Sequence, residues 1–254
     1  MAHGESVRVI RANAKKAPKV GWAPCGVIGV PESESAADVD AAKRYTCGVR
    51  GENLWNNTWY ADPIILGGYP EEGLRAYGAA APKAAPGDME MMKAPLDFYG
   101  VNIYNGTLLR AGAGGRIEML PRRPGYDKTQ LDWPVEPESL RFGPRWLHER
   151  YKLPVYITEN GLSAMDWVHL DGKVHDPQRI DFTTRYLRAL RRGIEEGADV
   201  RGYFHWSLLD NFEWENGYRQ RFGLIHVDYA TQKRTPKDSF EWYRGVIASN
   251  GASV

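Results

Sequence analysis

The sequence has few cysteines, no long apolar run and no recognisable leader. Its two cysteines, Cys25 and Cys47, form no paired metal-binding spacing, so we expect two unconnected thiols. No apolar stretch approaches the ~20 residues that a transmembrane helix needs. The first residues, Met1 to Glu5, lack the basic and apolar regions of a signal peptide. These absences together predict a cytoplasmic protein.

Neither sign of charge is in excess. The chain of 254 residues carries 33 basic and 32 acidic side chains. This balance provides no broad attraction to nucleic acid or to an anionic membrane, so we expect neither as a partner. A small neutral or polar ligand fits better. What the sequence does contain in quantity is aromatic residues, including 9 Trp and 14 Tyr, several of them in clusters.

Short apolar runs alternate with amphipathic helices along the chain. The predicted strands are Lys19 to Ala23, Phe98 to Tyr104, Val155 to Thr158 and Val200 to Ser207. The predicted helices are His3 to Lys16, Ala36 to Tyr45, a second helical piece running to about Tyr60, Pro137 to Tyr151, one starting at Asp176-Pro177 and ending near Gly197, and about Lys237 to Ala248. Strands separated by helices must run parallel, because the crossover returns on one hand. The pattern therefore predicts an α/β fold.

Two details of this assignment can be checked in the structure. Glycine and proline are dense in residues 61–95, and 111–134 lack a periodic pattern, so we expect both to be long surface loops. Asp176 is expected to cap the helix that starts at Pro177. We expect that helix to bury a stripe formed by Ile180, Leu187, Leu190 and Ile194.

The ends of the predicted strands carry polar side chains. In parallel sheets, ligand sites gather at the carboxyl ends of the strands. Glu159 ends the third strand, and Gly161 behind it lets the chain turn away. Asn102 and Tyr104 close the second strand two residues apart, on the same side of the pleat. A purely structural role, such as capping or an ion pair, remains open for Glu159.

The segment after the fourth strand, His205 to Tyr229, mixes rings with polar groups. Its aromatic residues are Trp206, Phe212, Trp214, Tyr218 and Phe222, interleaved with Asp210, Asn211, Glu213 and Glu215. A sugar needs this mixture, since its apolar face lies on a ring while its hydroxyls require donors and acceptors. Simple packing of the aromatic run is the alternative.

At these segments the chain resembles glycoside hydrolase family 1, which includes β-glucosidases, β-galactosidases and 6-phospho-β-glycosidases. The resemblance is carried by "YITENG" (Tyr156 to Gly161), "DFYGVNIY" (Asp97 to Tyr104), "GYFHWSLLDNFEWENGYRQRFGLIHVDY" (Gly202 to Tyr229) and "ADPIILGGYP" (Ala61 to Pro70). It implies a partial, half TIM-type (β/α) barrel, equivalent to strands five to eight of a (β/α)₈ barrel. The whole chain, 1–254, would be one such half-barrel domain, with no metal or organic cofactor.

The resemblance also implies a retaining β-glycosidase site. Glu159 matches the family nucleophile, and Tyr104 matches the tyrosine that hydrogen-bonds and orients it. The substrate-binding residues implied are Asn102 near the nucleophile, Trp206 as the platform under the sugar, Glu213 and Trp214 as hydroxyl-binding residues, and Phe222 as a wall. The pair Glu213-Trp214 resembles the pattern for unphosphorylated sugars. No function is assigned to His205.

The family's Asn-Glu-Pro motif, which carries the general acid/base, does not occur in these 254 residues. One hypothesis is a homodimer that closes a pseudo-barrel and brings two copies of Glu159 together. The acid could instead come from a complementary half-barrel chain, or from Glu215 or Glu52. The alternative is a sugar-binding or structural remnant without catalysis. The sequence does not distinguish glucosides from galactosides.

Overall fold

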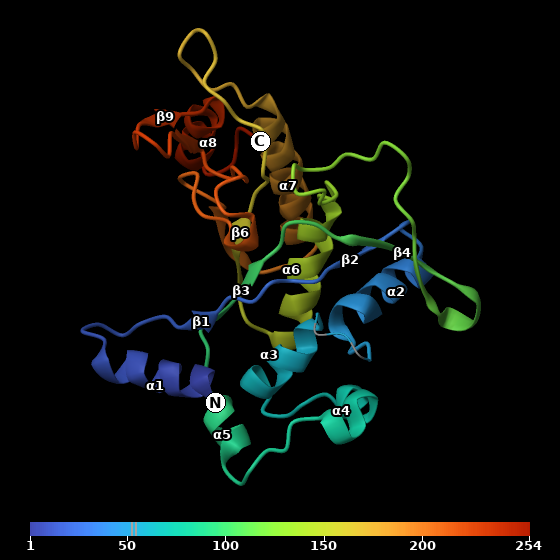
Figure 1. The fold of residues 1–254 in the computed structure, drawn as a ribbon. Coiled ribbons are helices and arrows are strands. Elements are labelled where there is room, and N and C mark those ends of the chain that lie inside the picture. Colours follow the sequence, from blue (N-terminus) through green and yellow to red (C-terminus); the bar gives the residue numbers. More distant parts are fainter. Residues whose placement is uncertain (52, 54) are drawn as a thin grey trace.

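A four-stranded parallel sheet forms the centre of the molecule. The structure, a computed structural model, describes residues 1–51, 53 and 55–254 (Figure 1). The strand order is β1-β3-β6-β7, and every neighbouring pair is parallel, which confirms the predicted arrangement. The strands are β1 (Gly21–Trp22), β3 (Phe98–Asn102), β6 (Val155–Asn160) and β7 (Val200–His205).

α-Helices precede, separate and follow the strands of this sheet. They are α1 (Ala2–Asn13), α2 (Ala36–Cys47), α3 (Asn57–Ile65), α4 (Glu71–Tyr77), α5 (Asp88–Met92), α6 (Glu138–Tyr151), α7 (Pro177–Glu195) and α8 (Asp238–Ala248), with single 3₁₀ turns at Gly78–Ala80, Ala113–Gly115 and Trp214–Asn216. None of the helices in the described part of the chain combines the length and the apolar character needed to cross a membrane. Cys25 and Cys47 are both free, as predicted.

One face of the sheet is covered by helices and holds the main core. Residues alternate between the two faces of a strand, and Val101 and Ile157 on this face are fully buried. The helices α6 and α7 pack against them (Figure 1). Their contributions to this core include Leu140, Leu147 and Tyr151 from α6 and Phe182, Tyr186 and Leu190 from α7. We call this side the covered face.

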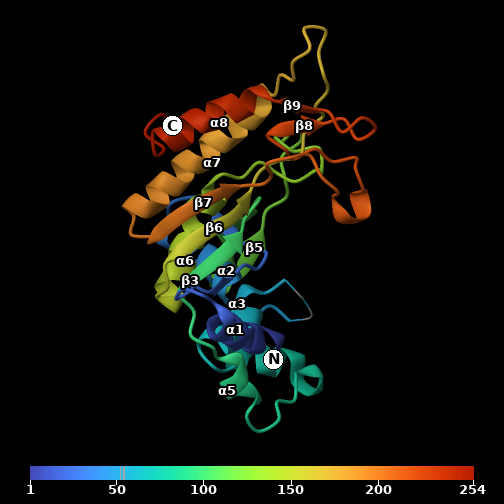
Figure 2. The ribbon, with the colours of Figure 1, turned by 90° about the vertical axis from the view of Figure 1, so that its left-hand side faces the viewer.

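The opposite side of the sheet, which we call the open face, carries rings in solvent. Phe98 and Tyr156 pack edge to face, with 5.0 Å between ring centroids. Both rings lie over glycines, because a Cβ at Gly202 would come within 2.5 Å of the Tyr156 ring and one at Gly21 within 2.4 Å of Phe98. Phe204 is 58% exposed. Figure 2 shows the sheet strands β3, β6 and β7 side by side.

The two segments predicted as long loops contain regular structure, so that expectation is wrong in part. Residues 61–95 include the end of α3, all of α4 and all of α5. Pro70 stands immediately before α4, with Glu71 in its first turn, so the proline starts a helix there instead of preventing one. In the other segment, β5 (Ile117–Met119) pairs with β4 (Thr107–Ala111), which in turn pairs with β2 (Gly29–Pro31).

The prediction for α7 is corrected in two respects. Leu190 is buried and Leu187 packs against the main core as predicted, whereas Ile194 is 45% exposed. The buried positions also include Phe182, Tyr186, Ala189 and Gly193, which lie outside the predicted stripe. Asp176 precedes the helix but does not cap it. Its carboxylate accepts hydrogen bonds from Ser239 at the start of α8 instead (2.8 Å from N, 2.6 Å from Oγ).

Two irregular parts surround the carboxyl end of the sheet. The segment 161–176 between β6 and α7 projects from the top of the molecule in Figures 1 and 2. Leu170 near its tip is fully exposed, and Trp167 and Val168 are partly exposed. Beside it lies a hairpin of β8 (Ile225–Val227) and β9 (Arg234–Pro236).

Candidate active site

The strand register places Glu159 at the carboxyl end of the sheet. A shift in the pairing of β3 with β6 sets Asn102 opposite Glu159. Ile103 N then donates to the carbonyl of Glu159 (3.0 Å). The fully buried Asn160 ties β6 to both neighbours, because its Nδ2 donates to Ile103 O (2.8 Å) while its Oδ1 accepts from Tyr203 Oη (2.7 Å). The backbone that carries Glu159 is therefore held on two sides.

Tyr104 is aimed at the Glu159 carboxylate. Its Oη donates to Glu159 Oε2 at 2.6 Å, and its backbone carbonyl accepts from Tyr186 Oη at 2.9 Å. Burial, followed by the hydrogen bond to Glu159 and the charge of that carboxylate, raises the pKa of Tyr104. The phenol therefore stays neutral and remains a hydrogen-bond donor to Glu159.

Asn102 is oriented by its neighbour on the next strand. Its Oδ1 accepts a hydrogen bond from Thr158 Oγ1 at 2.6 Å across the open face. The carbonyl end of the amide is thereby fixed, and no described residue bonds its NH2 group. Asn102 can thus offer a donor to a ligand lying beside Glu159.

Trp206 follows β7 directly and lies close to Gly161. Its backbone N donates to Asn160 O at 2.8 Å, and its peptide bond to Ser207 is cis. A Cβ at Gly161 would lie 1.9 Å from the carbonyl oxygen of Trp206. The glycine is therefore needed for this close approach of two chain segments, a constraint beyond the turn expected from the sequence.

Glu213 lies within electrostatic reach of Glu159, while Trp214 stands in solvent. The turn that carries them is closed by Glu213 N donating to Gly217 O at 2.7 Å. Burial and the charge of Glu159 raise the pKa of Glu213. Trp214 is 81% exposed, and Glu215 beside it is exposed as well. Glu52, the other alternative acid, lies outside the described residues.

Phe222 belongs to an aromatic cluster with a member that sequence reasoning missed. Phe222 is buried, and its ring lies 6.1 Å from Tyr104 and 6.2 Å from Trp133, centroid to centroid. Trp133 lies 5.2 Å from Tyr104. Trp133 falls in a segment predicted as loop, and its only sequence signal was a large ring in an otherwise polar stretch. It forms a further wall beside Tyr104.

A group of buried ion pairs fixes the loops around the site. Lys237 Nζ donates to Asp166 Oδ2 (2.6 Å) and to Asp210 Oδ1 (2.9 Å), and all three side chains are fully buried. Asp166 also accepts from Arg179, and Asp210 from Arg221 (2.6 Å). Each buried charge is paired, as burial requires. The cluster joins the segment 161–176 to the loop that carries Glu213.

The arrangement offers an oriented carboxylate flanked by rings, hydroxyls and amides. Glu159, Tyr104 and Asn102 are brought together by β3 and β6, and Trp206 adjoins Gly161 just behind them. In the described part of the chain, no group of three or more His, Cys, Asp or Glu side chains is placed to hold a metal ion. The oriented carboxylate of Glu159 has the chemistry to act as a nucleophile or as a base.

Known proteins match the chain over almost its whole length. The model of the family described as Glycosyl hydrolase family 1 matches residues 1–252. Beta-glucosidase A of Thermotoga maritima is 38% identical over 254 residues, covering 98% of this chain and 55% of that protein. A bifunctional beta-D-glucosidase/beta-D-fucosidase of Bifidobacterium breve is 34% identical, covering 99% of this chain and 56% of the relative.

Solved structures give the same result. The family 1 β-glucosidase of Thermotoga maritima in complex with isofagomine lactam superposes with a TM-score of 0.80 at 36% identity, covering 98% of this chain and 55% of the other. The chain thus spans about half the length of the relatives it matches. The predicted half (β/α) barrel is confirmed by this match and by the four parallel strands with their helices.

Proposed function

Because the chain belongs to glycosyl hydrolase family 1, we propose that it hydrolyses β-linked glucosides or galactosides, with Glu159 as the attacking group. The observation that carries the proposal is the 2.6 Å hydrogen bond from Tyr104 Oη to Glu159 Oε2 at the carboxyl end of β6. Since the chain spans 55% of Beta-glucosidase A of Thermotoga maritima, the activity is proposed from the site and not transferred from that protein.

The proposed reaction begins with attack of the Glu159 carboxylate on the anomeric carbon. A bond forms between a carboxylate oxygen and that carbon, while the bond to the leaving oxygen breaks and its electron pair departs on that oxygen. Water then attacks the anomeric carbon and gives a proton to the general base, while the bond from that carbon to Glu159 breaks and its electron pair returns to the carboxylate. Tyr104 orients the carboxylate through its hydrogen bond, so that an oxygen is presented to the sugar.

The sugar is proposed to lie over Trp206. Its ring would stack on the indole, Asn102 would donate to a hydroxyl near Glu159, and Glu213 with Trp214 would contact the hydroxyls far from the anomeric carbon. Phe222 closes the pocket from behind Tyr104. Support for this placement comes from the contact of Gly161 with Trp206 and from the electrostatic coupling of Glu213 to Glu159.

The general acid is proposed to come from a second polypeptide, either another copy of this chain or a complementary half-barrel chain. Two features support this: no Asn-Glu-Pro motif occurs in the sequence, and rings such as Phe204 and Trp214 are largely exposed on the side where a partner would close the site. A molar mass in solution tests it. A mass of a single chain across the concentrations assayed would exclude the homodimer, and activity appearing only after mixing with an amino-terminal half would favour the complementary chain.

Turnover of activated aryl β-glycosides tests Glu159 itself. Nitrophenolate leaves without needing a proton, so a site with a nucleophile alone should release it from an aryl β-glucoside but leave cellobiose intact. Glu159→Gln should reduce the rate by about a thousandfold or more. The exposed Glu195→Gln on α7 is the matched control, and Glu215→Gln tests the alternative acid. Unchanged turnover in Glu159→Gln would refute the proposal.

The second candidate function is sugar binding without catalysis. The observation that favours it is that, among the described residues of the site, Glu159 is the one carboxylate held by a hydrogen bond from a buried phenol. In that case a sugar mimic such as isofagomine lactam should bind with an affinity that falls in Trp206→Ala, while no aryl glycoside is turned over by the wild-type chain.

A further inference from the structure

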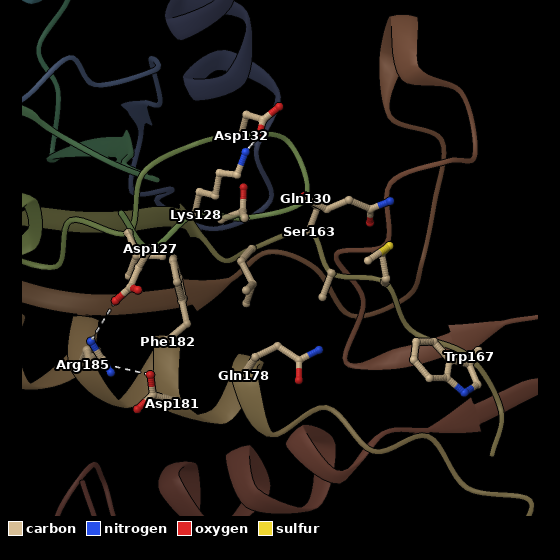
Figure 3. Close-up of a pocket in the computed structure, with 15 residues that line it drawn as sticks. Asp127, Lys128, Gln130, Asp132, Ser163, Trp167, Gln178, Asp181, Phe182 and Arg185 are labelled. Carbon is tan, nitrogen blue, oxygen red and sulfur yellow. Dashed lines mark hydrogen bonds and ion pairs between the residues drawn. The ribbon is translucent and has the colours of Figure 1, made fainter. Parts of the chain in front are cut away.

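A groove of about 850 Å³ lies beside the candidate active site. Its walls come from residues 127–135, from residues 162–167 and from the first turns of α7 (Figure 3). The groove shares two of these segments with the site. Residues 162–167 follow Glu159 closely in the chain, and residues 127–135 hold Trp133 against Tyr104.

The walls of the groove are held together by hydrogen bonds between its two loops. Gln130 N donates to Ser163 O at 3.1 Å, and Leu131 N donates to Ser163 Oγ at 3.2 Å. Thr129 N donates to Trp133 O at 2.9 Å. These backbone contacts join the two loops into one wall, so the groove has a defined shape before any ligand enters.

Three polar side chains in the groove have no partner. The hydroxyl of Thr129 is shielded from solvent without a hydrogen bond, although the residue is only 6% exposed. No described residue bonds the side-chain amides of Gln130 or Gln178. Figure 3 shows these two amides reaching into the same space from opposite walls. A buried hydroxyl without a partner costs free energy that a ligand can recover.

Both cations that line the groove are already paired with carboxylates. Arg185 pairs with Asp181 (2.8 Å) and Asp127 (3.8 Å), and Lys128 pairs with Asp132. No lining cation is left over for a phosphate or carboxylate group. The groove therefore favours a neutral ligand rather than an anionic one.

Apolar surfaces complete the groove. Phe182 and Leu162 form a buried floor, and Trp167 stands at one end with its ring 59% exposed. An exposed ring at one end, together with two amides that no described residue bonds, suits a molecule with apolar CH faces and many hydroxyls. We propose that this groove is a second carbohydrate site that binds a neutral oligosaccharide.

The inference goes beyond the proposed function, because binding in the groove needs no turnover at Glu159. It rests on that function only for the choice of probe, a β-linked glucose oligomer. The bound residues could belong to a chain whose end occupies the Glu159 site or to a separate molecule. The chemistry recognised in the groove is the same in both cases.

Calorimetric titration with cellotetraose tests the groove. The double variant Gln130→Ala and Gln178→Ala should bind about tenfold or more weakly, since each lost hydrogen bond is worth about a factor of five. Asn13→Ala, which removes an exposed amide on α1, should bind like wild type. No measurable binding of the wild-type chain, or equal affinity in the double variant, would overturn the proposal.

Thr129→Val provides a readout that a structural role would not give. The variant keeps the shape but removes the unpartnered hydroxyl, so the free protein should unfold at an equal or higher temperature while cellotetraose binds about fivefold more weakly. A lower unfolding temperature with unchanged affinity would contradict the assignment of Thr129 to the groove.

Trp206→Ala separates the two sources of the bound sugar and the two proposals. Unchanged cellotetraose affinity in this variant indicates a separate molecule in the groove, and weakened affinity indicates a chain spanning both sites. If the wild-type chain turns over no aryl glycoside yet loses cellotetraose binding in the double variant, the proposed function fails and the groove stands.

Discussion

The two faces of the central sheet are built from neighbouring residues, but one face packs against helices and the other carries the candidate site. On β6, Ile157 points to the covered face and is fully buried, whereas Thr158 points to the open face and orients Asn102. On β7, Tyr203 points to the covered side and bonds Asn160, whereas Phe204 is largely exposed. The covered face holds the helices, and the open face leads to Glu159 and Trp206.

This difference shows how one strand can specify a fold and a site at once. Because side chains alternate with a period of two, a change on one face leaves the other nearly untouched. The bulge at the end of β6 is the exception, since it brings Glu159 onto the site beside Asn102. Substitutions on each face test whether the two faces are independent in this way.

The largest expected effect comes from the covered face. Ile157→Ala should lower the free energy of unfolding by about 2–5 kcal/mol, because it leaves a cavity in the main core. Phe204→Ala on the open face should change it by less than about 0.5 kcal/mol. Chemical denaturation measures both. A comparable loss in Phe204→Ala would mean that something covers the open face in solution.

The contact between Gly161 and Trp206 should be the next most sensitive. Gly161→Ala places a Cβ 1.9 Å from the Trp206 carbonyl oxygen, so the backbone must shift at a cost of about 1–3 kcal/mol. Binding of a sugar mimic should weaken as well, since Trp206 moves. Gly245→Ala in α8 is the control, because no atom lies near its added Cβ and alanine should stabilise the helix.

His205 makes the covered face sensitive to acid. Its ring nitrogens are shielded and unpaired, and burial with the charges of Arg179 and Lys237 lowers its pKa to about 3. The unfolded chain binds a proton below the ordinary pKa of about 6.5, whereas the folded chain does not. The free energy of unfolding is therefore unaffected by His205 above about pH 6.5. It falls as the pH drops from there toward 3, by up to about 1.4 kcal/mol per pH unit.

His205→Val should flatten this dependence. The measurement is the difference in unfolding free energy between variant and wild type at several pH values from 7 to 4, about the range in which the histidine titrates on unfolding. The variant should gain relative stability as the pH falls. A constant difference over that range would show that His205 is not held neutral in the fold.

A smaller loss than in the core or at Gly161 is expected from the hydrogen bond across the open face. Thr158→Val removes the donor to Asn102 Oδ1 without changing shape and should cost about 0.5–1.5 kcal/mol. A double-mutant cycle with Asn102→Ala measures the coupling between the two side chains. Strictly additive losses would show that the bond does not orient Asn102.

The sequence predicted the four strands of the central sheet and most helices because their apolar periodicity is strong, but it did not predict β2, β4, β5, β8 or β9. The four strands appear in the predicted order. Glu159 and Tyr104 lie together at the carboxyl end of the sheet, as their positions at the strand ends predicted. Residues 61–95 were assigned to a loop because Gly and Pro were interpreted as breakers. Asp62, buried in α3 and bonded by Tyr151 Oη at 2.8 Å, shows that long-range contacts stabilise helix there.

Other features depend on distant partners that a linear pattern does not reveal. Asp176 stands where a cap is expected, but Ser239, far along the chain, supplies its donors. The role of Trp133 depends on its contact with Phe222, and that of Gly161 on the carbonyl of Trp206. Each of these contacts joins segments whose approach is decided only when the sheet has formed.

The projecting segment 161–176 has a practical consequence. Its tip at Leu170 is exposed. Below the tip, buried ion pairs join Asp166 of this segment to Arg179 in α7 and to Lys237 before α8. A protease should nick the tip first, and the two fragments should stay together after the cut because the joint lies below it. The same tip is the natural place to insert a tag or fluorophore without disturbing the carboxyl end of the sheet.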